Sequence, residues 1–172
     1  MKGRARAALA DCENALVDFE ASVNTSFQKT RWIAVMSLLR TVGLVLKEVD
    51  HPAASPDVQR RIDTAWKDLN ATKPNPRIFH DFIDHERYQV VHLYEINTRV
   101  NATVAPIPEP HTYFLATMFD DDEDSGFGWN PTTFTFFMRS GPFTGRDPCE
   151  LCREAIQFWR NYLDGIDSGA AS

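Results

Sequence analysis

Three residues near the middle of the chain have side chains suited to acid–base and phosphate chemistry: Arg87, His92 and Tyr94. An imidazole exchanges a proton near neutral pH and can act as a general acid or base. A guanidinium binds a phosphate group and stabilises the charge that develops on it in a transition state. Chemistry on a phosphate ester is therefore one interpretation of Arg87 and His92, and an exposed or structural arginine and histidine, common in helix-rich chains, is the other.

The element that must position these residues is predicted to be one helix from Arg77 to Asn97. Its apolar residues recur at helical spacing and should pack it against a bundle: Phe79, Phe82, Ile83, Val90 and Leu93. On an α-helix Arg87 and Tyr94 point the same way, whereas Arg87 and His92 lie about 140° apart. We therefore expect a second helix or a second subunit to complete a site that uses both, as at a two-fold interface.

An arginine, four residues, a histidine, one residue and a tyrosine on a helix resemble the motif of the HEPN-domain family. The resemblance is greatest to the HEPN toxins that pair with a minimal nucleotidyltransferase antitoxin. Tyr88 stands where that family usually has asparagine or another small polar residue. The resemblance implies a homodimer that cleaves RNA without a metal, with Arg87 and His92 as the catalytic pair. It also implies an antitoxin protein as a partner, and Tyr94 as the residue that the antitoxin modifies.

A second polar stripe on this helix has spacings of four, three and four residues, and consists of Asp81, His85, Tyr88 and His92. Two histidines and an aspartate on one face could bind a metal, but the sequence has no second ligand cluster to close such a site. We favour a hydrogen-bonded polar face, with His85 and Tyr88 as further binding residues. We predict no metal site and no cofactor.

Glu86 falls on the apolar stripe of the same helix. A buried carboxylate requires a cationic partner, and Arg40 lies in a predicted helix, residues 27–50, that is apolar on nearly all sides. We expect a structural ion pair between Arg40 and Glu86 that orients the motif helix.

The remaining pattern predicts a mainly α fold, a bundle of about five helices with a small β-hairpin inserted before the C-terminal helix. Helices are also expected at residues 5–22 and from Ser55 and Pro56 onward. A last helix should begin with Asp147 as its N-cap and run to about Asp164, where Gly165 ends it. The hairpin strands are predicted at His111–Phe119 and Thr132–Arg139. Residues 1–172 form one domain, with residues 104–146 as a connector and hairpin insertion.

Composition limits the function. A chain of 172 residues with 43% hydrophobic and 24% charged residues suits one globular domain. A net charge of −6 argues against broad attraction to nucleic acid, so any RNA site must be local. The sequence contains no apolar run long enough for a membrane span, and we expect a cytoplasmic protein that does not bind membranes.

Three cysteines, Cys12, Cys149 and Cys152, do not suggest a disulfide framework, and we expect reduced thiols. Zinc at Cys149 and Cys152 would need two more ligands from distant segments, so a buried cysteine is the favoured interpretation. The acidic stretch at residues 120–124 matches no calcium-loop pattern and should be a solvated loop tip, away from any RNA.

These observations lead to two hypotheses. The first is an RNA-binding protein of HEPN type, in its stronger form a metal-independent endoribonuclease of a toxin–antitoxin or defence system. The alternative is a non-catalytic helical module that dimerises or binds a partner protein. A surface that exposes Arg87 and His92 favours the first, and side chains locked in internal pairs favour the second.

Overall fold

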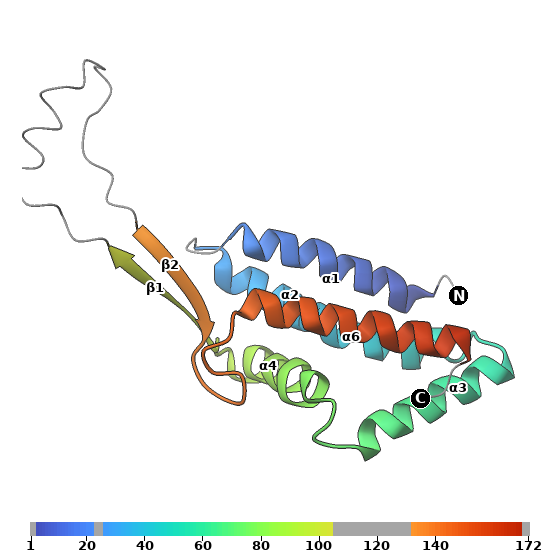
Figure 1. The fold of residues 1–172 in the computed structure, drawn as a ribbon. Helices are drawn as coiled ribbons and strands as arrows, with labels where there is room; N and C mark the ends of the chain where they lie inside the picture. Colours follow the sequence, from blue (N-terminus) through green and yellow to red (C-terminus); the bar gives the residue numbers. More distant parts are fainter. Residues whose placement is uncertain (1–2, 23–25, 105–131, 170–172) are drawn as a thin grey trace, which may run out of the picture. The chain divides into compact units, whose positions relative to one another are not determined.

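The computed structural model describes residues 3–22, 26–104 and 132–169 of the chain (Figure 1). Within them lie the helices α1 (Arg4–Glu20), α2 (Gln28–Val45), α3 (Pro56–Ala71), α4 (His85–Tyr88) and α6 (Pro148–Ser168). Three π-helical stretches extend these helices: η1 (Leu46–Asp50), η2 (Ile78–Asp84) and η3 (Gln89–Leu93). The fold is mainly α, with a two-stranded antiparallel hairpin before the C-terminal helix, which confirms the predicted fold class.

The chain divides into a helical unit, Met1–Arg99 with Phe137–Ser172, and a second unit, Val100–Phe136. The strands β1 (Thr98–Val104) and β2 (Thr132–Met138) are hydrogen-bonded to each other. The prediction of the second strand is confirmed. Its observed partner begins at Thr98, whereas the predicted first strand, His111–Phe119, and the acidic stretch 120–124 lie outside the described residues.

The core of the helical unit is built around α2, whose buried stripe consists of Trp32, Val35, Met36, Leu39 and Val42. α1 packs along α2, and α6 contacts both of them. Gly43 lets Trp159 of α6 approach α2 closely, because a Cβ atom at this position would lie 2.7 Å from Cη2 of this fully buried indole. A larger residue at Gly43 would force the indole out of its place in the core.

Carboxylates cap two of the helices. The buried Asp50 accepts hydrogen bonds from the backbone N–H groups of Arg4 and Ala5, at 2.9 and 2.8 Å, and so satisfies free donors at the start of α1. Asp147 accepts from the N–H of Cys149 at 2.7 Å, as predicted for the cap of α6. The predicted end of α6 at Gly165 is wrong, because the helix continues to Ser168 and ends at Gly169 in a left-handed conformation.

The three cysteines are buried and free. Burial raises the pKa of Cys12 to about 12 and that of Cys149 to about 12, so both stay protonated at neutral pH. In the part of the chain that the structure describes, no three His, Cys, Asp or Glu side chains come together as a metal site would require. Among those same residues, no helix combines the length and apolar character needed to cross a bilayer.

Candidate functional site

The motif helix runs continuously through η2, α4 and η3, from Ile78 to Leu93. Phe79, Phe82, Ile83, Glu86 and Val90 are buried, as the predicted stripe requires. Leu93 is 48% exposed, and this part of the prediction is wrong. The helix ends at Leu93 rather than at Asn97, because Tyr94 adopts a left-handed conformation with φ 55° and ψ 30°.

Arg87 and His92 come together within a single chain. Nη1 of Arg87 lies 3.4 Å from Nε2 of His92 in an exposed hydrogen bond. The prediction that one helix would hold these side chains apart is wrong, because it assumed α-helical geometry. A second subunit that completes the site stays a prediction. A π-helical turn bonds residue i to residue i+5, so residues five apart come to lie over one another.

The contact selects one tautomer of a neutral His92 ring, because a guanidinium can only donate hydrogen bonds. Nε2 of His92 must therefore accept, and the neutral ring carries its proton on Nδ1. The ring of Tyr88 packs against the imidazole, with centroids 4.9 Å apart and planes inclined by 36°. His92 is thus held by one neighbour through its Nε2 atom and by another against its ring.

Arg87 differs from most other described arginines in having no carboxylate partner among the described residues. Arg77 pairs with Asp81 at 2.9 Å and Arg153 with Glu20 at 2.5 Å, whereas the described residues offer Arg87 no carboxylate within ion-pair distance. In a chain of net charge −6, this leaves a cation beside an imidazole at the surface. Such a position is open to an anionic ligand.

Two tyrosines close to the pair in sequence are largely open to solvent, Tyr88 at 51% and Tyr94 at 66% exposure. Tyr94 lies in the left-handed turn after the helix. The prediction that it points the same way as Arg87 assumed that both residues belong to one α-helix, and Tyr94 does not belong to the helix. Lys29 of α2 places its ammonium group 3.5 Å from the centroid of the Tyr94 ring, in a cation–π contact. The Nε2 atom of His85 lies 3.5 Å from Nε2 of Gln89.

Behind this surface lies a buried polar network that sequence reasoning missed. Nδ2 of Asn97 donates to Oε1 of Glu86 at 3.0 Å and to the carbonyl oxygen of Ser140 at 2.9 Å. The Ser140 hydroxyl donates back to Oδ1 of Asn97 at 2.6 Å. Burial raises the pKa of Glu86, and its Oε2 atom has no hydrogen-bond partner among the described residues. Asn97 was recognisable only as a polar residue after the motif, with no periodic signal of burial.

The predicted pair between Arg40 and Glu86 is not formed, and this prediction is wrong. Nε of Arg40 instead binds Oδ1 of Asp84 at 2.7 Å. Asp84 is the last residue of the π-helical stretch η2, whose wider turn changes which side chains face α2. Glu86 is buried as predicted, but its partner is the neutral Asn97.

Comparisons with models of known protein families, with curated proteins and with solved structures find no match to this chain. The proposed function therefore rests on the chemistry of Arg87, His92 and the exposed Tyr88 and Tyr94, which we together call the Arg87 surface.

Proposed function

We propose that the Arg87 surface binds RNA and that the protein is a metal-independent endoribonuclease of HEPN type. The observation that carries the proposal is the exposed contact of 3.4 Å between Arg87 and His92, where none of the residues that the structure describes places a carboxylate to neutralise the arginine. Tyr88 and Tyr94 support it, because exposed aromatic rings provide stacking surfaces for unpaired bases. Lys29 adds a second positive charge close to Tyr94.

The proposed reaction requires the site to open. A charge-assisted bond from Arg87 to a phosphate oxygen is stronger than a bond to a neutral imidazole, so a bound phosphate would draw the guanidinium away from His92. Nε2 of His92 would then be free to accept the proton of a ribose 2′-hydroxyl as that oxygen attacks the phosphorus atom. The P–O5′ bond breaks, and the leaving 5′-oxygen takes a proton from solvent. Arg87 would stabilise the additional charge on the phosphate oxygens.

The decisive experiment incubates the purified protein with RNA in the presence of EDTA, and compares it with Arg87→Ala and His92→Ala. We expect the wild type to cleave and to leave 2′,3′-cyclic phosphate and 5′-hydroxyl ends, and both variants to lose most of this activity. Arg60→Ala is the matched control, because Arg60 is an exposed arginine of α3 that pairs with Asp57. Equal cleavage by all four proteins, or none by any, would remove the catalytic proposal.

A specific observation also favours the alternative function, a protein-interaction module. Val91 and Leu93, exposed by 46% and 48%, extend the Arg87 surface with apolar side chains. A protein partner, such as an antitoxin, would bury these side chains together with the two tyrosines. If Arg87→Ala weakens binding of a neighbouring gene product while RNA is neither bound nor cut, the interaction module replaces the nuclease.

A further inference from the structure

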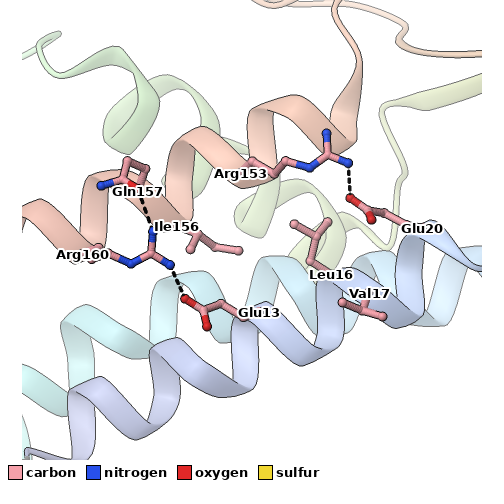
Figure 2. Close-up of a pocket in the computed structure, with 8 residues that line it drawn as sticks. All are labelled: Glu13, Leu16, Val17, Glu20, Arg153, Ile156, Gln157 and Arg160. Carbon is pink, nitrogen blue, oxygen red and sulfur yellow. Dashed lines mark hydrogen bonds and ion pairs between the residues drawn. The ribbon is translucent and has the colours of Figure 1, made fainter.

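A groove of about 330 Å³ runs between α1 and α6 (Figure 2). Its lining residues belong to these two helices and not to the motif helix. Its floor includes the buried Leu16 and Ile156. Val17, in the last turn of α1, lies at the α1 side of the groove and is 65% exposed. We call this region the α1/α6 groove.

The two sides of the groove carry opposite charges. Glu13 and Glu20 project from α1, and Arg160 and Arg153 project from α6 opposite them (Figure 2). Each acid forms an ion pair of 2.5 Å with the arginine at its own height, Glu13 with Arg160 and Glu20 with Arg153. On each helix the two charged residues are seven apart, so they lie about 10 Å from each other along the axis.

This arrangement is complementary to itself under one particular symmetry. A two-fold axis that runs along the groove keeps every residue at its height and exchanges the α1 side with the α6 side. It brings Glu13 of a second copy over Arg160, and Glu20 of that copy over Arg153. A two-fold axis across the groove would instead place acid over acid and arginine over arginine, which is repulsive.

We propose that the α1/α6 groove is a self-association surface, occupied by the same groove of a second copy in a two-fold dimer. The contact buries Val17 of both copies near its centre, and each arginine then lies between two carboxylates. Exposed ion pairs contribute little within one chain, so sharing them between copies costs little. Because charge complementarity contributes more to orientation than to affinity, the dimer should be weak and sensitive to salt.

The proposal differs from the dimer expected across the motif helix from the sequence. No residue of the α1/α6 groove belongs to α4 or η3, so the Arg87 surface is left outside the contact. The inference is therefore independent of the proposed ribonuclease function, and either can fail alone.

A reciprocal charge exchange tests the proposal by sedimentation equilibrium. An acidic variant combines Arg153→Glu with Arg160→Glu, and a basic variant combines Glu13→Arg with Glu20→Arg. Each alone should have a dimer dissociation constant at least about tenfold above that of the wild type, since all four groove charges then repel their counterparts. An equimolar mixture of the two variants should associate again, as a heterodimer.

A single substitution keeps the test valid if the charge variants fail to fold. Val17→Asp changes an exposed side chain and should leave the circular dichroism spectrum unchanged while it prevents association. Val91→Asp is the matched control, because Val91 is also an exposed valine but lies in η3. A wild type that stays monomeric at every concentration, or a dimer disrupted by Val91→Asp and not by Val17→Asp, would overturn the proposal.

Discussion

Nη1 of Arg87 donates to Nε2 of His92 across five residues of one helix, a contact that the π-helical turn Gln89–Leu93 makes possible. The consequence is a defined tautomer for His92, with its proton on Nδ1 when the ring is neutral. This relationship joins the backbone geometry of the motif to the chemistry proposed for it, since a general base needs an unprotonated nitrogen that faces its substrate.

The tautomer can be measured by long-range ¹⁵N–¹H correlation spectra at alkaline pH. We expect Nε2 of His92 to show the shift of an unprotonated nitrogen, and Arg87→Met to return a proton to Nε2 in part of the molecules. His80 is an internal control of opposite sign, because its Nε2 lies 2.9 Å from the carbonyl oxygen of Leu69 and must donate. A proton on Nε2 of His92 in the wild type would contradict the Arg87 contact.

The sequence was sufficient to predict where α1 and α2 lie and most of the apolar residues that pack the helices into the core. Apolar spacing placed α1 and α2 and the stripe of the motif helix, since burial of one face is the main determinant of helix position. The cap at Asp147 was also predictable, because its side chain acts on the backbone two residues away. Each of these signals is local or periodic.

What the sequence could not provide is the winding of the helix. π-helical turns arise where tertiary packing outweighs the local preference for α-helix, and no residue spacing marks η2 or η3. Two errors followed from assuming ideal geometry: Arg87 and His92 were placed apart, and Arg40 was paired with Glu86 rather than Asp84. The role of Asn97 depends on Ser140, 43 residues later, and equally lacks a local signal.

Double-mutant cycles on the free energy of unfolding can test whether Arg40 pairs with Asp84, as observed, or with Glu86, as the sequence predicted. We expect a coupling of about 1 kcal/mol between Arg40→Met and Asp84→Asn, since both side chains are only partly exposed. The cycle of Arg40→Met with Glu86→Gln is the control and should give a coupling near zero. A larger coupling to Glu86 than to Asp84 would restore the pair expected from the sequence.

Gly43→Ala tests the packing of α2 against α6. In an open helix this change would stabilise the protein by up to about 1 kcal/mol, because alanine has the higher helix propensity. Here the new methyl group would lie 2.7 Å from the ring of Trp159 and 3.2 Å from that of Trp66. We therefore expect a net destabilisation of about 1–3 kcal/mol in denaturant unfolding, together with altered tryptophan fluorescence. Unchanged or increased stability would mean that the indole of Trp159 can move aside.

Glu86 gives a prediction for the pH dependence of stability. Its raised pKa means that the folded protein keeps the proton at pH values where the unfolded chain has already released it. The contribution of Glu86 to stability therefore falls as the pH rises from the unfolded pKa through the folded pKa, and is constant above that.

Glu86→Gln removes this titration and retains an oxygen that can accept from Nδ2 of Asn97. We expect the variant to gain stability over the wild type as the pH rises from acid to neutral, by about 1 kcal/mol or more, because a buried carboxylate oxygen without a partner is no longer charged. Urea unfolding at a series of pH values measures the difference. Glu154→Gln is the control, since Glu154 is an exposed acid whose partner is Arg146. A difference for Glu86→Gln that is independent of pH would show that Glu86 keeps its proton, or releases it, equally in both states.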